Sequence, residues 1–434
     1  MYTKEKRSVI TTMEKLQKLV IFGLFTFVLG FFAGAAVWAV LKIMHLGIEF
    51  IWHGFPALLH IEAGLGYHLA ICLIGGLLIG CIQQRVGVLP DNMHQVMGTV
   101  KSTGGYPYDH LGLIAVTALL PLIFGGALGP EAGLSGFIAG LCCFIGDRLK
   151  YKGDLVAAMA ETGISATLTA VFKAPFFGVA SHLERDAKDT TYRKKLVAKK
   201  TRILLYCMGV IGATAAMKVM SHFFGANPGL PRFTREHAIG WGQWKWALLL
   251  FVVGILAAII FLFFNKITLA LNNRFGNHRI AACLVVGVVL AIVGFCVPEA
   301  MFSGEEQMGD LIHDWIAYPS GMLILIGITK MFLTNFCINL GWRGGNIFPL
   351  IYSGVAIGYA FSIIVQMQGA NALLDGSFAV ALVVASMYGY IMQKPLMVVA
   401  VLLLCFPITY IIPITVAAFV AAKVPQIPAL KGGI

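Results

Sequence analysis

Three breaks in the apolar pattern, each containing glycine, hold the residues of this chain whose types could do chemistry in a hydrophobic setting. They are Val86-Gly87-Val88-Leu89-Pro90, Gly129-Pro130-Glu131-Ala132-Gly133 and Gly344-Gly345-Asn346-Ile347-Phe348-Pro349. Glycines ahead of a helix let the backbone turn tightly, and Pro130 suits a first helical position, where its missing N–H would be unpaired anyway. Free N–H groups at a helix N-terminus attract anions. If the helix N-termini after the three breaks point at one place in the membrane, they form a site that holds a small anion mostly through helix dipoles.

Glu131 is the ionisable residue inside these breaks. An ionisable group in an apolar stretch marks a functional site by default. Its carboxylate resembles a small anion, so the two would compete for the same helix N-terminus. The alternative is a glutamate that only complements the helix dipole. We favour the interpretation in which the Glu131 carboxylate competes with an anion.

The elements that must position these breaks are apolar. The 434 residues are 59% hydrophobic and only 12% charged, whereas soluble domains carry about 25% charged residues. Several apolar runs are shorter than the roughly 20 residues of an upright spanning helix. Irregular backbone survives in lipid only where protein buries it or a wet cavity lines it, so interrupted runs indicate a transport pathway. We therefore expect an all-α polytopic membrane protein, and neither a soluble enzyme nor a nucleic-acid binder.

The chain falls into two halves of similar length. The break at Gly129-Pro130-Glu131 in the first half and the break at Gly344-Gly345 in the second lie at similar distances from the start of each half. Matching breaks indicate an internal repeat with the site between the halves. The expected organisation is a cytoplasmic N-terminal segment, a first membrane half-repeat, a connecting loop, a second membrane half-repeat and a short tail, at 1–17, 18–222, 223–243, 244–424 and 425–434.

The net charge of +12 is concentrated in short connections between apolar runs. The densest basic group lies within 185–202, which predicts a cytoplasmic loop under the positive-inside rule. The first apolar run, about 19–44, is longer than a signal-peptide core of roughly 7–15 residues, so we expect it to remain as a span. The nine cysteines lie in apolar stretches and form no C-x-x-C pair. A multi-pass protein of the cell membrane with a cytoplasmic N-terminus is predicted.

The second and third breaks, the latter preceded by Arg343, resemble two signature motifs of the CLC family of chloride channels and chloride/proton exchangers. Order, spacing and hydropathy are compatible with that family over about residues 18–422. The resemblance implies an inverted repeat of tilted, partly broken helices that forms a homodimer, with a complete anion pathway in each subunit. It implies that chloride or another small anion, protons and the lipid bilayer are the partners.

The resemblance also implies roles for individual residues. Glu131 would block the outer anion site when ionised and would carry protons in an exchanger. The anion would be held mostly by backbone groups of residues in the three breaks, namely Gly87, Val88, Gly129, Ala132, Gly133, Gly345, Asn346, Ile347 and Phe348.

Three departures from the family pattern bear on proton coupling. Gly87 stands where a hydroxyl residue usually lies beside the anion, no tyrosine follows Tyr410, and Arg185 stands where many exchangers carry an inner acidic residue. These changes favour a channel or a loosely proton-coupled transporter. Glu161 is a substitute inner proton acceptor, or else a residue that reaches the cytoplasmic interface by snorkelling.

The competing interpretations are a strict chloride/proton antiporter and a transporter of another halide such as fluoride. A lipid or organic-solute transporter would leave the Gly344–Pro349 helix start unexplained. A membrane-embedded enzyme would need a Ser/His pair, an acidic pair or a metal triad at helical spacing, and the apolar runs contain none. We therefore expect no enzymatic activity, metal or cofactor.

Overall fold

The computed structural model describes residues 2–148, 154–172, 199–225, 231–234, 241–367 and 374–430. Regular structure in these residues is helical, apart from an isolated antiparallel bridge between Gly129 and Gly345. The chain divides into two compact units, each assembled from segments that are distant in sequence. The first comprises Met1–Ala39, Gln95–Leu111 and Phe137–Ala226, and the second comprises Val40–His94, Gly112–Gly136 and Asn227–Ile434.

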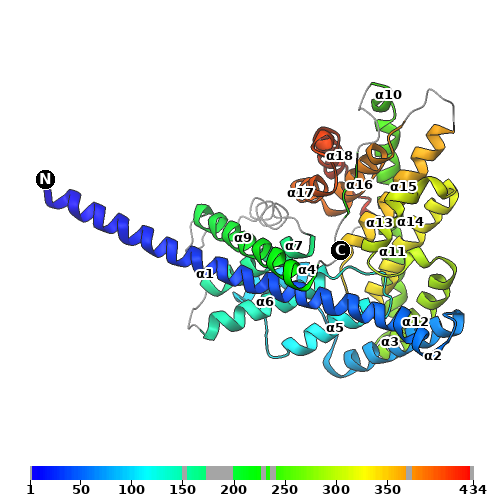
Figure 1. The fold of residues 1–434 in the computed structure, drawn as a ribbon, viewed down its shortest axis with the longest axis horizontal. Helices are drawn as coiled ribbons and strands as arrows, with labels where there is room; N and C mark the ends of the chain where they lie inside the picture. Colours follow the sequence, from blue (N-terminus) through cyan, green and yellow to red (C-terminus); the bar gives the residue numbers. More distant parts are fainter. Residues whose placement is uncertain are drawn as a thin grey trace. The chain divides into compact units, whose positions relative to one another are not determined.

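The first unit contains the N-terminal part of a long helix, α1, together with parts or all of four further helices. Their bounds are α1 Tyr2–Glu49, α4 Met93–Thr103, α6 Glu131–Arg148, α7 Asp154–Phe172 and α9 Lys199–Phe224. α1 and α9 lie side by side (Figure 1), and a Cβ on Gly30 would lie 2.1 Å from the carbonyl oxygen of Gly209. The two helices therefore touch through their backbones, a packing mode that small residues permit in membranes.

The second unit holds most of the remaining helices. The helices up to residue 123 are η1 Phe50–Gly54, α2 Phe55–Leu59, α3 Leu65–Val86 and α5 Leu111–Ile123. Those that follow are α10 Trp241–Trp244, α11 Ala247–Phe275, α12 Arg279–Cys296, η3 Pro298–Ala300, α13 Glu305–Asp314, η4 Trp315–Ala317, α14 Ser320–Asn339, α15 Ile347–Gln366, α16 Gly376–Met392, α17 Pro395–Cys405, η5 Ile408–Tyr410, α18 Ile411–Lys423 and η6 Pro428–Leu430.

The core of the second unit is the pair α15 and α16, around which α11, α14 and α18 gather (Figure 1). Every residue of α15 from Ile347 to Ala360 is buried, as is every residue of α16 from Gly376 to Ile391. Both helices are apolar on all sides, which is the pattern of a fully enclosed helix. Gly358 lets the two helices approach closely, because a Cβ there would lie 2.6 Å from the Cα of Val380.

A second close approach joins α3 to α12. A Cβ on Gly76 would lie 2.6 Å from the carbonyl oxygen of Cys283, and one on Gly287 would lie 2.5 Å from that of Cys72. Both cysteines are buried with free thiols. The Gly76/Gly80 spacing in the sequence thus serves helix packing.

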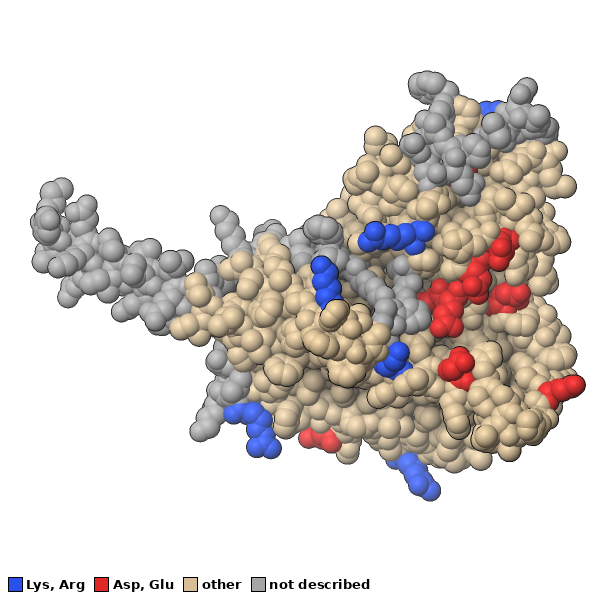
Figure 2. Space-filling view, viewed as in Figure 1, with Lys and Arg blue, Asp and Glu red and all other residues tan. Residues whose placement is uncertain are grey.

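Seven helices in the described part of the chain are long and apolar enough to cross a membrane, and four shorter apolar helices accompany them. Figure 2 shows acidic side chains gathered in one area and basic ones scattered over an otherwise uncharged face. Many large apolar side chains, such as Leu24, Leu248 and Ile412, are exposed, and they suit contact with lipid. The protein is a multi-pass membrane protein with partly broken helices, as its sequence predicts.

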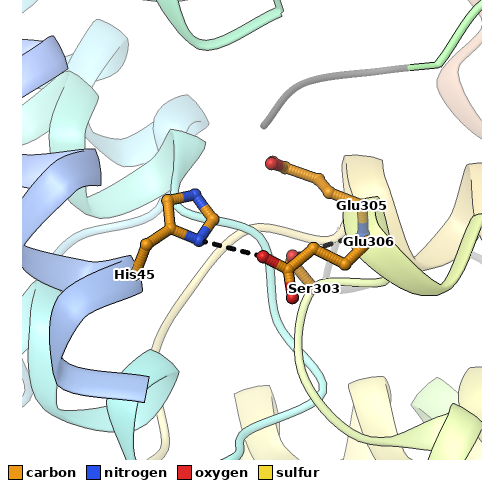
Figure 3. A network of polar contacts seen from close by, with 4 residues as sticks. All are labelled: His45, Ser303, Glu305 and Glu306. Atoms are coloured by element: carbon orange, nitrogen blue, oxygen red, sulfur yellow. Dashed lines mark hydrogen bonds and ion pairs between the residues drawn. The ribbon is translucent and has the colours of Figure 1, made fainter. Parts of the chain in front are cut away.

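A polar network connects α1 to α13 within the second unit (Figure 3). Nδ1 of His45 lies 3.5 Å from Oε1 of Glu306, and the Ser303 hydroxyl accepts a 3.5 Å hydrogen bond from the N–H of Glu305. His45, His53 and Glu306 line a cavity of about 100 Å³. The hydrogen bond from His45 holds the pKa of Glu306 below its ordinary value.

Candidate functional site

The second and third glycine-rich breaks meet directly. The N–H of Gly129 donates to the carbonyl of Gly345 at 2.8 Å, and the N–H of Gly345 donates to the carbonyl of Gly129 at 2.7 Å. This reciprocal exchange is that of a hydrogen-bonded pair in an antiparallel ladder. It fixes the start of α6 against the start of α15.

Both members of this bridge are glycines because the Glu131 side chain fills the space beside them. A Cβ on Gly129 would lie 2.0 Å from Oε2 of Glu131, and a Cβ on Gly345 would lie 1.9 Å from its Cδ. Real Cβ atoms do not approach other atoms so closely, and packed cores tolerate added atoms poorly. Because positions 129 and 345 carry no side chain, they leave the space that the Glu131 carboxylate occupies.

Glu131 is the first residue of α6 and is 1% exposed. Its Oε1 accepts a 2.7 Å hydrogen bond from the N–H of Ile347, the first residue of α15. Its Oε2 is buried and has no hydrogen-bond partner among the described residues. The carboxylate thus occupies the N-terminus of α15, a position with positive potential from the helix dipole and an orphan N–H.

A cavity of about 80 Å³ opens beside this carboxylate. Its lining comprises Glu131, Ala132 and the helix start 344–347, together with Asn92 and residues of α11, α14, α16 and α17. A single water needs roughly 10–15 Å³ of such volume, so the cavity has room for a small ion with water. Amide side chains contribute much of its polar lining, among them Asn265, Asn335 and Asn339.

Five of the residues singled out from the sequence line this cavity, namely Glu131, Ala132, Gly345, Asn346 and Ile347. Gly129 joins them through the bridge. Phe348 is fully buried within α15, and Gly133 faces α5, where a Cβ would meet that of Ala118 at 2.3 Å.

The first break is placed differently from the other two. Gly87 ends α3 with a φ of 97°, a conformation that suits glycine, and it is exposed. Neither Gly87 nor Val88 belongs to the cavity lining, whereas Asn92, from the same connection, does.

Glu161 lies on α7 in the first unit and is 1% exposed. The hydroxyl of Tyr206 on α9 donates to its Oε2 at 2.6 Å. Glu161 is not among the residues that line the cavity beside Glu131. Arg185 and most of the basic group within 185–202 fall outside the described residues.

Tyr388 on α16 is a residue that sequence reasoning missed. It is 1% exposed, and its hydroxyl has no hydrogen-bond partner among the described residues. A tyrosine inside an apolar run carries no signal that separates it from packing residues. Asn335 and Asn339 could have been noticed, because amides at i and i+4 in an apolar run form one polar stripe.

The fold and the site define a multi-pass helical membrane protein in which discontinuous helices meet at a buried carboxylate. The family described as voltage gated chloride channel, the CLC family, matches residues 75–426. The chain belongs to this family. The resemblance stated from the sequence motifs is thereby confirmed.

Solved structures show the same fold. An X-ray crystal structure of a slow cyanobacterial Cl-/H+ antiporter matches with a TM-score of 0.77 at 15% identity, over 92% of this chain and 93% of that chain. A CLC-type fluoride/proton antiporter matches with a TM-score of 0.66 at 17% identity, over 94% and 95%. A eukaryotic CLC transporter matches with a TM-score of 0.70 at 16% identity, over 94% and 72%. The predicted CLC-like helical fold is confirmed.

Proposed function

We propose that the protein transports small monovalent anions, chloride foremost, along a path gated by the Glu131 carboxylate. The observation that carries this proposal is the 2.7 Å hydrogen bond from the Ile347 N–H to Oε1 of Glu131. A helix N-terminus is a ready anion site, and here the protein's own carboxylate fills it. An anion from solution competes for that N–H.

Protons act on the same competition. Protonation removes the charge of Glu131, so its attraction to the N-terminus of α15 weakens and the anion gains the site. The flux of anions should therefore rise as the pH falls. The backbone N–H groups of 346–348, 132 and 133, at the starts of α15 and α6, remain our proposed anion contacts. The N–H groups of Gly87, Gly129 and Gly345 already donate to backbone carbonyls, and Val88 does not line the cavity.

Coupling of this flux to net proton transport should be loose. The position of Gly87 offers no hydroxyl, and an obligate cation, Arg185, stands where a proton-relaying acid is common. Glu161 is our proposed inner proton acceptor, supported by its burial and by the Tyr206 hydroxyl that holds it. A strict chloride/proton antiporter and a fluoride transporter are the alternatives.

Purified protein in liposomes tests the proposal, with chloride efflux and proton uptake recorded together. We expect chloride efflux that increases at acid pH and little uphill proton movement under a chloride gradient. A fixed chloride-to-proton ratio across several gradients would establish the antiporter, and preference for fluoride in the same vesicles would establish the other alternative. The absence of anion flux at any pH would refute the proposed function.

We further propose that the protein acts as a homodimer in the cell membrane, with half-repeats 18–222 and 244–424. The N-terminus and the basic segment 185–202 would face the cytoplasm, in line with the positive-inside rule. A cysteine introduced by Ala198→Cys should resist impermeant thiol reagents in intact cells and react after permeabilisation, with the unmodified protein labelled in parallel. If intact cells are labelled beyond that background, the segment 185–202 faces the outside and the proposed topology is wrong.

A further inference from the structure

A hydrogen-bonded cluster of polar side chains joins α11 to α14, and two of its members, Asn265 and Asn339, line the cavity. Nδ2 of Asn339 donates to Oδ1 of Asn265 at 2.9 Å and to Oγ1 of Thr268 at 2.8 Å. The Thr268 hydroxyl in turn donates to the carbonyl of Phe264 at 2.8 Å. All three residues are buried, with Asn265 4%, Thr268 1% and Asn339 7% exposed.

This cluster fixes which end of the Asn265 amide faces the cavity. Because Oδ1 of Asn265 accepts from Asn339, its NH₂ group points away from Asn339, and it makes no hydrogen bond to any described residue. Asn265 lines the cavity that Glu131 also lines. By contrast, Nδ2 of Asn335 already donates to the carbonyls of Phe261 and Met331. Asn265 therefore presents a pair of unused N–H donors to the cavity.

The two N–H groups of the Asn265 amide can donate hydrogen bonds to an occupant of the cavity. The occupant must accept hydrogen bonds, and it must fit a space whose other wall is a helix N-terminus. A small anion meets both requirements. A neutral amide also suits transport, because conduction needs binding that is favourable but weak enough for release.

We propose that the Asn265 side-chain amide binds the transported anion within this cavity and helps to set anion affinity and selectivity. Asn339 is a positioning residue, which acts by holding the Asn265 amide in this orientation. The inference rests on the proposed function and adds to it a side-chain contact on α11, outside the three glycine-rich breaks.

The test compares Asn265→Asp with Asn273→Asp. The first variant keeps the shape and an oxygen for Asn339 but replaces the donors with a charged acceptor. The second makes the same charge change at an exposed position of the same helix. Chloride and bromide binding to detergent-purified protein is measured by calorimetry, and chloride efflux is measured from liposomes. Size-exclusion profiles check the fold.

We expect Asn265→Asp to weaken anion binding at least about tenfold, the scale of one lost hydrogen bond to a charged group, and Asn273→Asp to match wild type. Asn265→Ala serves if the aspartate variant fails to fold, and it should also weaken binding. Asn339→Leu lets the Asn265 amide turn, so it should change the chloride-to-bromide affinity ratio. A merely structural role would leave this ratio unchanged.

The outcomes separate this inference from the proposed function. Wild-type affinity and selectivity in both Asn265 variants, with pH-dependent efflux intact, would overturn the role of Asn265 and leave transport standing. Absence of anion binding and efflux in the wild-type protein would overturn both.

Discussion

The Glu131 carboxylate and the backbone nitrogen of Ile347 lie 2.7 Å apart, at the first residues of α6 and α15. One hydrogen bond thus joins the starts of two helices from different glycine-rich breaks. The second carboxylate oxygen is buried without a described partner. The proposed gating requires that a small anion compete with this carboxylate for the Ile347 N–H.

Replacing Glu131 with Gln should make anion efflux nearly independent of pH, because the amide carries no charge to gain or lose. Any proton movement coupled to efflux should disappear. Efflux from liposomes measures this over about pH 4 to 9, the range that ordinary and raised carboxyl pKa values span. The exposed Glu62 supplies the control, Glu62→Gln, which should keep the wild-type profile. A wild-type pH profile in Glu131→Gln would remove Glu131 from the gate.

Replacing Gly345 with Ala should displace the carboxylate, because the new Cβ would lie 1.9 Å from Cδ of Glu131. We expect efflux at neutral pH to approach its acid-pH value, and stability to fall by about 1–3 kcal/mol from overpacking. Thermal unfolding and efflux measure the two effects. Gly309→Ala is the matched control, since no atom lies within 4 Å of its added Cβ. Unchanged pH dependence in Gly345→Ala would mean that the carboxylate does not occupy this space during transport.

Lys330 on α14 is fully buried, and its Nζ donates to the carbonyls of Met301 at 2.5 Å and Phe302 at 2.8 Å. Lys330→Met keeps most of the aliphatic volume but leaves both carbonyls without this donor. We expect a loss of about 1–3 kcal/mol of stability, seen as a lower midpoint of thermal unfolding in detergent. Lys266→Met, at an exposed position of α11, should change stability by about 0.5 kcal/mol or less. Equal midpoints for the two variants would contradict this assignment.

The Glu306 carboxylate should make a small, pH-dependent contribution to stability. The hydrogen bond from His45 lowers its pKa, so the folded state favours the charged form. That stabilisation is present above the unfolded-state pKa and is lost as the pH falls through the lowered folded-state pKa. Glu306 is 60% exposed, so we expect well under 1 kcal/mol. Glu306→Gln should flatten the acid side of the thermal-midpoint profile, with Glu62→Gln as control. An unaltered profile would show that the contact contributes nothing.

The sequence predicts the membrane class and two of the three breaks because their signals are local. Glycines and Pro130 before an apolar run specify a helix start wherever the helix later packs. No local sequence signal predicts that Gly87 lies outside the cavity. The same holds for the polar cluster that Asn265 forms with Asn339. Both depend on which faces of α3, α11 and α14 turn inward, and tertiary packing decides this. Lys330 escaped notice for the same reason, since the carbonyls that it binds lie 28 and 29 residues away.

The bond between Glu131 and Ile347 also has a consequence for biogenesis. Its partners are 216 residues apart, and ribosomes add about 5–20 residues per second, so Glu131 is synthesised roughly 10–40 s before Ile347. During that interval the start of α6 has no α15 to receive its carboxylate, and Gly129 has no bridge partner. An acidic residue without a partner is poorly tolerated in hydrocarbon. A chain truncated before α15 therefore keeps this acidic residue without the backbone N–H that receives it in the folded protein.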